Sequence, residues 1–559
     1  MGLRGRDVVL QAFREYGVRY IFGNPGTTEL PLLDGLFHFP DMEYVMALHE
    51  DIAVGMALGY AQASGRPGVV NLHVAPGVAH GLGNLYEAWR SHVPLVVTAG
   101  QHDLRLSVQE PGLAGNLLSM VRDVTKWCWE VTRVEELPIV MQRAFKEALT
   151  HPQGPVFVSL PVDVMWQETD RRPLPLTTIR QEHYADPQAV DLAARMILQA
   201  AKPVLIVGDR VGQTGAVEAA VRLAELTGMP VYQEPMSARL NFPAAHPSFA
   251  GQLPPNGPQI AAAMADADLV LWVGVMNQAP LLYYPQALVP PSTPLIAVDL
   301  DARQLGKNGH AALAILGHPG AVMDRWAEAI EKLATPEDRA RFAERQGQLR
   351  EKKAQFEARK EAELARASRQ APLSPAVVMA ALNRYVDERF ILVEEAVTSS
   401  WFVHRYVYVN RPGSRFALKG GGLGYGLAAA LGVQLARPDE RVVAVVGDGS
   451  ALYYIQALWN AARWQLPVIF LIVNNTSYMI LKGGMLAIRG EAAKNQFFPG
   501  MDLEGPAVDF VQAARAFGVE ACRVEDEAQL LAALEEAFRE RKPYLLDVCI
   551  DRTPRPVLM

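Results

Sequence analysis

RVVAVVGDGS (residues 441–450) and LPVIFLIVNNTS (residues 466–477) decide the fold of this chain. Each contains an uninterrupted apolar run, which is typical of a strand buried on both faces of a parallel sheet. The intervening residues, 451–464, are predicted to form one helix that joins the two strands. Asp448 and Asn475 therefore stand at the carboxyl ends of two strands, where open α/β sheets bind ligands.

The polar residues at these strand ends suit a cation and a diphosphate. The Asp448 carboxylate and the Asn475 side-chain oxygen are hard ligands for a divalent ion. Gly447, Gly449 and Ser450 leave backbone N–H groups free to face phosphate oxygens at the start of a helix. Gly-Asp-Gly alone is equally a good turn, but an Asn pair that ends 27 positions after Asp448 makes the pattern specific. The chain contains no G-x-x-x-x-G-K-[ST], which argues against a P-loop enzyme.

With both elements together, the chain resembles the thiamine diphosphate enzyme superfamily. The resemblance implies thiamine diphosphate as cofactor and Mg²⁺, or Ca²⁺ or Mn²⁺, as the metal. It implies that Asp448, Asn475 and the backbone carbonyl of Ser477 bind the metal. It also implies cofactor contacts elsewhere. Thr398, with Ser399 or Ser400, would form a second diphosphate-binding loop, and the carbonyl of Gly421 would accept the amino group of the cofactor. Leu423 would support the bent cofactor, and Tyr478 would contact it after the Asn pair.

Thiamine chemistry also needs a carboxylate against the aminopyrimidine ring, in an apolar cleft. Residues 44–48 read as a strand and residues 51–63 as a helix of small residues, with Glu50 at the junction. An acid at a helix start is also favoured by the helix dipole alone. The surrounding sequence resembles the superfamily pattern ALxE…GYAxASG, so Glu50 is interpreted as the acid that activates the cofactor.

Composition restricts the other possibilities. The 559 residues are 50% hydrophobic and 20% charged, and the net charge of −7 argues against nucleic acid or an anionic membrane as partner. Three cysteines do not form a disulfide framework, and the N-terminus has no apolar signal core. A cytoplasmic protein without a membrane partner is expected.

Three α/β units are predicted, each a doubly wound parallel sheet: a pyrimidine-binding domain (1–180), a middle domain (185–335) and a diphosphate-binding domain (373–555). A Pro-rich linker (170–175) and a charged helical connector (336–369) separate them. VGDRVG (207–212) is not a dinucleotide fingerprint, which leaves open whether the middle domain binds FAD. The two halves of the cofactor site lie some 400 residues apart, which favours assembly between subunits: a homodimer at least, and a homotetramer by resemblance.

Over almost its whole length the chain most resembles the benzoylformate-decarboxylase-like branch. FGNPGTTELP (22–31), NLHVAPG (71–77) and FPAAHPSFAG (242–251) carry this likeness. The resemblance implies that Thr27 holds the substrate carboxylate and that His73 moves a proton.

Two positions depart from that branch. Leu281 stands where a second active-site histidine is expected, and Ala417 replaces a pocket aromatic. Met479, Ile480 and Leu481 are expected to supply apolar walls. The predicted function is non-oxidative decarboxylation of a benzoylformate-like 2-oxo acid to an aldehyde and CO₂. A carboligase of the acetolactate synthase type, which forms 2-hydroxy ketones, is the alternative that the missing histidine favours.

Overall fold

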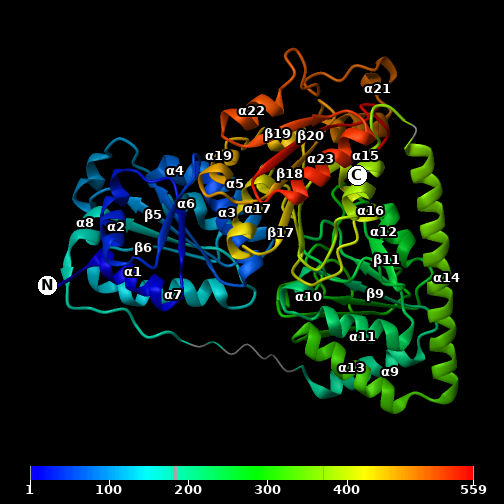
Figure 1. Cartoon of the computed structure of the whole chain (residues 1–559). Helices are drawn as coiled ribbons and strands as arrows, with labels where there is room; N and C mark the ends of the chain where they lie inside the picture. The colour runs from blue at the N-terminus through cyan, green and yellow to red at the C-terminus, as the bar shows by residue number, and fades with distance from the viewer. Residues whose placement is uncertain (1, 178, 180–184, 369, 558–559) are drawn as a thin grey trace.

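Three parallel sheets form the framework of the chain (Figure 1). The structure is a computed structural model that describes residues 2–177, 179, 185–368 and 370–557. Each of these sheets has six strands, and all neighbouring strands within them run parallel. The predicted fold class is thereby confirmed. Residues 180 and 369, which bound the predicted first domain and the charged connector, lie outside the described residues.

The N-terminal sheet places the predicted strands next to one another. Its order is β3 (Glu43–Met46), β2 (Tyr20–Gly23), β4 (Gly68–His73), β5 (Leu95–Gln101), β7 (Val156–Pro161) and β6 (Trp127–Glu130). Its longer helices are α1 (Gly5–Glu15), α3 (Glu50–Ser64), α5 (Leu82–Arg90) and α7 (Leu137–Leu149). Helix α3 stops where Gly65 takes a left-handed conformation, φ 71°, which glycine adopts without strain.

The middle sheet has the order β11 (Phe249–Gln252), β10 (Val231–Gln233), β9 (Pro203–Val207), β12 (Leu269–Val273), β13 (Leu295–Asp299) and β14 (Leu313–Leu316). Helices α9 (Pro187–Gln199), α11 (Val217–Thr227), α12 (Gly257–Met264) and α13 (Pro319–Leu333) belong to this domain. The connector is one long helix, α14 (Pro336–Ala367), which runs along one side of the molecule (Figure 1). Only Phe342 and Ala367 are buried among its residues, as expected for a solvated helix.

The C-terminal sheet brings the two opening motifs side by side. Its order is β16 (Arg415–Ala417), β15 (Phe390–Glu395), β17 (Arg441–Gly447), β18 (Ile469–Asn474), β20 (Tyr544–Cys549) and β19 (Glu520–Val524). Its helices include α15 (Pro375–Asn383), α17 (Tyr425–Ala436), α22 (Phe510–Ala516) and α23 (Glu527–Arg539). Because β17 and β18 are parallel neighbours, the residues that follow them meet at one edge of the sheet.

The single helix predicted for residues 451–464 is wrong. The segment contains the end of α18 (Asp448–Ala451), a turn, and α19 (Ala457–Arg463). The turn carries Tyr454, whose ring centroid lies 5.1 Å from that of His49 and whose hydroxyl is hydrogen-bonded to Asp51. This contact with the N-terminal domain takes the place of a continuous helix.

Helices α3 and α17 pack together and join the N-terminal and C-terminal domains (Figure 1). Their contact depends on two glycines, which have no side chain. A Cβ atom at Gly59 would overlap the backbone oxygen of Ala429, and one at Gly432 would overlap that of Met56. The two backbones can approach this closely only because both positions are glycine. In the described part of the chain, no helix is long and apolar enough to cross a membrane.

We expect Gly432→Ala to lower the stability of the protein, because the new methyl group meets backbone atoms that cannot move aside. Overpacking of this kind costs roughly 1–3 kcal/mol, which thermal unfolding would detect as a lower Tm. Gly347→Ala is the matched control: Gly347 lies in α14 with open space around it, so alanine there should leave Tm equal or slightly higher. Equal Tm values for Gly432→Ala and the natural protein would contradict this account of the contact.

Candidate active site

Asp448 lies at the sheet edge with its carboxylate held by backbone N–H groups. Gly449 N–H donates to Oδ1 (2.8 Å), and Asn475 N–H donates to Oδ2 (3.0 Å). Burial outweighs these bonds and raises the pKa of Asp448 to about 6. A carboxylate that is buried and still attracts protons is also one that a bound cation would stabilise.

The two asparagines of the pair have different environments. Asn474 Nδ2 donates to Asp547 (2.7 Å), so its side chain is part of the sheet's own structure. The Oδ1 atom of Asn475 is buried and has no hydrogen-bond partner in the described chain. An unsatisfied buried acceptor is costly, and a metal ion would satisfy it. Asn475, beside Asp448, therefore fits the donor set predicted for a hard divalent cation.

Two glycines that are predicted to contact the cofactor, Gly449 and Gly421, stand where a side chain would not fit or would strain the backbone. A Cβ at Gly449 would lie 2.6 Å from the ring of Tyr478, so that ring packs directly on the backbone of the Gly-Asp-Gly turn. Gly421 and Gly424 have φ values of 86° and 100° in the loop before α17, a conformation that glycine adopts readily. The loop also contains Leu423, the predicted apolar prop.

A buried acid, Glu395, holds the end of this glycine loop. Its carboxylate accepts from Gly424 N–H (2.7 Å) and Gly426 N–H (2.6 Å). Glu395 ends β15 and precedes the predicted diphosphate loop, in which Thr398 and Ser399 form a short 3₁₀ turn. Burial raises the pKa of Glu395 to about 7 despite both backbone donors.

The start of the loop is fixed by Lys419, which is fully buried. Its ammonium contacts Asp209 (2.6 Å) and Glu234 (2.9 Å) of the middle domain. Its backbone N–H donates to Glu87 of the N-terminal domain (2.7 Å). Burial alone would raise the pKa of Asp209, but Lys419 and the hydrogen bonds around Asp209 lower it to about 2. One residue thus ties the glycine loop to both other domains.

Backbone strain gathers beside the predicted site residues. Val74, Val397 and Thr476 have φ values of 39°, 48° and 52°, a region that β-branched residues rarely enter. Each is next to a predicted site residue: His73, Thr398 and the pair Asn475 and Ser477, respectively. No other β-branched residue in the described chain has positive φ. Such strain is found at functional sites, where the surrounding structure holds it.

Glu50 is the first residue of α3, and His49 caps that helix by accepting the Asp51 N–H on Nδ1 (3.1 Å). The carboxylate of Glu50 lies 3.1 Å from His80 Nδ1. In the described residues no hydrogen bond joins Glu50 to Asp448 or Asn475. A single chain therefore presents the two predicted halves of the cofactor site without a direct bond between them.

Comparisons with known proteins agree with this geometry. The N-terminal TPP binding domain of thiamine pyrophosphate enzymes matches residues 3–117, the central domain residues 190–326, and the C-terminal TPP binding domain residues 396–548. The chain is 34% identical to benzoylformate decarboxylase of Pseudomonas aeruginosa, over 96% of this chain and 97% of that protein.

The chain is a thiamine pyrophosphate enzyme.

Other relatives of this thiamine pyrophosphate enzyme have different names. A probable acetolactate synthase large subunit of Methanocaldococcus jannaschii is 27% identical, over 98% of this chain and 92% of that protein. Among solved structures, the thiamine diphosphate-dependent 4-hydroxybenzoylformate decarboxylase of Rhodococcus jostii RHA1 superposes with a TM-score of 0.86 at 30% identity, covering 99% of this chain and all of the other. Both lines of resemblance predicted from the sequence are thus present among its relatives.

The second predicted catalytic residue of the enzyme, His73, ends β4 and is held by an acid that the sequence analysis missed. His73 Nδ1 lies 2.8 Å from Glu29 Oε2 and 3.1 Å from Thr28 Oγ1. The other oxygen of Glu29 accepts from Gly100 N–H (2.9 Å). The only sequence signal for Glu29 was an acid directly before the apolar run LPLL. The structure brings Thr28 to His73, whereas Thr27 is exposed.

The predicted pocket residues of the enzyme lie on three separate elements. Leu281 is 57% exposed in a middle-domain loop, where its N–H donates to the Pro255 carbonyl. Ala417 is buried at the end of β16, and its N–H donates to Ala238. Met479, Ile480 and Leu481 begin α20 (Met479–Ile488), with Met479 buried and Leu481 exposed. That they line one pocket together stays a prediction.

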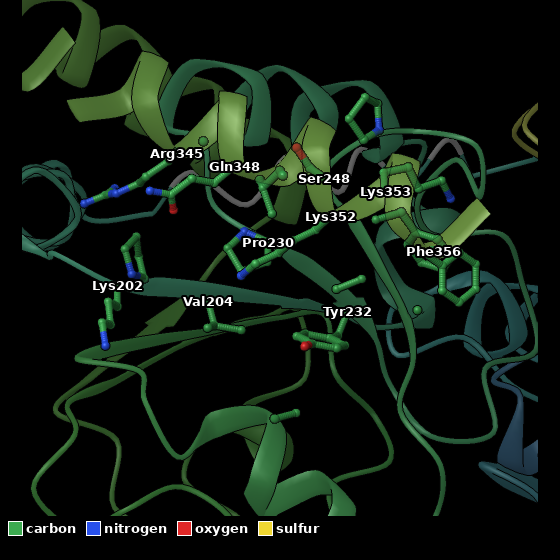
Figure 2. A pocket seen from close by; sticks show the side chains of 18 of the residues that line it. Lys202, Val204, Pro230, Tyr232, Ser248, Arg345, Gln348, Lys352, Lys353 and Phe356 are labelled. Atoms are coloured by element: carbon green, nitrogen blue, oxygen red, sulfur yellow. The ribbon is translucent and has the colours of Figure 1, made fainter. Parts of the chain in front are cut away.

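The VGDRVG segment makes one ion pair to another domain and one within the middle domain. Asp209 binds Lys419, and Arg210 is fully buried 3.4 Å from Asp299. A cavity of about 610 Å³ lies elsewhere in this domain, between α14 and the sheet (Figure 2). Lys202 and Tyr232 line it from the sheet, and Arg345, Lys352 and Phe356 line it from α14. No predicted site residue lines this cavity.

The raised pKa of Glu395 predicts a pH-dependent stability. The protonated carboxyl is the more stable form in the fold, so its contribution is complete below the ordinary pKa of 4.5 and is lost as pH rises through about 7. The free energy of unfolding should therefore fall as pH rises, and we expect Glu395→Gln to remove about 2 kcal/mol of that fall. Tm measured from about pH 5 to 8 checks this.

Glu388→Gln is the control, because Glu388 is exposed in the same domain. It should leave the pH dependence of Tm unchanged. A Glu395→Gln profile that runs parallel to that of the natural protein would rule out Glu395 as the group concerned.

Proposed function

We propose that this enzyme decarboxylates a benzoylformate-like 2-oxo acid to an aldehyde and CO₂, without oxidation. The observation that carries the proposal is His73, a partly exposed imidazole at a strand end whose Nδ1 is taken by buried Glu29. Because a carboxylate only accepts, Nδ1 carries the proton, and Nε2 is left to exchange a proton with the substrate. The relatives named as decarboxylases support the same reaction.

The parts of the chain have separate roles in this proposal. Asp448, Asn475 and the Ser477 carbonyl would hold Mg²⁺, or Ca²⁺ or Mn²⁺, and with it the diphosphate. The cofactor, when bound, supplies the carbon nucleophile and accepts the electrons released with CO₂. Glu50 would hold the proton at the aminopyrimidine ring nitrogen. The hydroxyl of Thr27, or of its neighbour Thr28, would orient the substrate carboxylate.

After CO₂ leaves, a proton must reach the former keto carbon or its oxygen, and His73 Nε2 is the proposed donor. Met479 and Ile480 would exclude water from that position. Since the two predicted halves of the site lie some 400 residues apart in the sequence, we propose that a homodimer completes the site and that the enzyme is a homotetramer. A cytosolic location belongs to the same proposal.

A carboligase is the second candidate, and Leu281 is the observation that favours it. Its exposed apolar side chain offers no proton where the decarboxylase branch has a histidine. A slower proton transfer would let a second carbonyl compound react first and give a 2-hydroxy ketone. The acetolactate synthase relative is consistent with this outcome.

The decisive assay supplies the enzyme with thiamine diphosphate, Mg²⁺ and one 2-oxo acid at a time, including benzoylformate, phenylpyruvate and pyruvate. We expect CO₂ and an aldehyde from the aromatic acids, measured by CO₂ release and product chromatography. Glu50→Gln should reduce the rate about a hundredfold or more. A hydroxy ketone as the main product would show that the enzyme is a carboligase. If no acid released CO₂, both the decarboxylase and the carboligase proposals would be wrong.

The Asn pair offers a matched test of the metal site. Asn475→Ala should weaken Mg²⁺-dependent cofactor binding by roughly tenfold or more, with little change in the Tm of the cofactor-free protein. Asn474→Ala should instead lower the free energy of unfolding by roughly 1–3 kcal/mol, and with it the Tm, because buried Asp547 loses its hydrogen-bond donor. Titration calorimetry and thermal unfolding separate the two effects, and equal binding loss in both variants would argue against Asn475 as a ligand.

A further inference from the structure

Two histidines that the proposed mechanism does not use stand beside the activating acid. His49 is the N-cap of α3, and His80 is the last residue of α4 (Val74–His80). One ring nitrogen of each and a carboxylate oxygen of Glu50 all lie within 4.8 Å of one another. Two imidazoles and one carboxylate are a common set of ligands for zinc and similar transition-metal ions.

The rings of this cluster are held in place by their neighbours. The Nδ1 atom of His49 accepts the Asp51 N–H (3.1 Å). The ring of His49 lies between those of His80 and Tyr454, with centroids at 5.2 and 5.1 Å. Because Nδ1 accepts this bond, the neutral ring carries its hydrogen on Nε2, and a metal bound by His49 would take the place of the Asp51 N–H on Nδ1.

The nearby charges leave the cluster available to a cation. His80 Nδ1 is 3.1 Å from Glu50, and its side chain is 56% exposed, against 14% for Glu50. In the single, cofactor-free chain, solvent therefore reaches the cluster from the His80 side, which leaves room for a metal ion to enter. Asp51 adds a second acid close by, but its carboxylate accepts from Asn84 N–H (2.7 Å) and is also bonded to Tyr454. No lysine or arginine contacts the cluster in the described chain.

We propose that His49, Glu50 and His80 form a binding site for Zn²⁺ or a similar transition-metal ion, separate from the diphosphate metal site. Its consequence rests on the proposed function. The carboxylate that would bind the zinc is the one needed at the aminopyrimidine ring, so zinc and the cofactor exclude each other. Zinc is then an inhibitor that competes with thiamine diphosphate and not with Mg²⁺.

Cobalt titration of the cofactor-free protein tests the site without any assay of turnover. We expect one equivalent of Co²⁺ to give the visible d–d absorption of a site with nitrogen ligands and low coordination number, and Zn²⁺ to displace it. His80→Ala and His80→Asn should weaken this binding by roughly tenfold or more. Both variants should fold, because His80 is largely exposed.

Two controls separate this site from the rest of the protein. His310→Ala removes an exposed histidine of the middle domain and should leave Co²⁺ binding unchanged. Asp448→Asn damages the predicted diphosphate metal site and should also leave the cobalt spectrum unchanged. A spectrum lost in Asp448→Asn but kept in both His80 variants would overturn the proposal, as would no d–d absorption at one equivalent.

The inhibitory consequence has its own readout. Prior incubation with thiamine diphosphate and Mg²⁺ should prevent the cobalt spectrum from forming. Zn²⁺ should raise the thiamine diphosphate concentration needed for half-maximal activity, and the His80 variants should reduce that effect. Cobalt binding without turnover of any 2-oxo acid would end the proposed function and keep the metal site; turnover without cobalt binding would do the reverse.

Discussion

The contact between α3 and α17 is the constraint on which the rest of the structure depends. Glu50 starts α3, and the glycine loop with Gly421 leads into α17. Since the helix backbones meet at Gly59 and Gly432, neither helix can rotate or slide without overlap. The contact fixes the positions of both segments that are predicted to bind the cofactor, even though they are some 400 residues apart. It also explains why both helices are rich in alanine and glycine, because closely packed main chains leave no space for larger side chains between them.

The sequence was most informative where local patterns carry the answer. Buried parallel strands are continuous apolar runs, so β9, β12, β17 and β18 could be placed, and with them the strand ends at Asp448 and Asn475. The structural role of Asn474 could not be predicted, because it depends on Asp547, which joins the sheet from far along the chain. The break between α18 and α19 has the same origin in the contact of Tyr454 with another domain.

Residues that act through long-range contacts were the ones that sequence reasoning missed. Glu29 has an unremarkable place in the sequence, and its importance comes from β4 and β5 bringing His73 and Gly100 to it. Glu395 looks like the end of a strand until its carboxylate is seen to hold two N–H groups of the glycine loop. The backbone strain at Val74, Val397 and Thr476 also has no signature in residue type, since β-branched residues are poor candidates for such positions.

Lys419 has a consequence for how the domains of this family can be exchanged. Its ammonium forms ion pairs with Asp209 and Glu234, which belong to the middle domain. A middle domain taken from a relative would have to bring both carboxylates to the same places. Without them a charged amine would be left in a dry interior, at a cost of several kcal/mol, directly beside the glycine loop. In this chain the middle domain is therefore not an interchangeable module, because its side chains neutralise the buried charge beside the glycine loop.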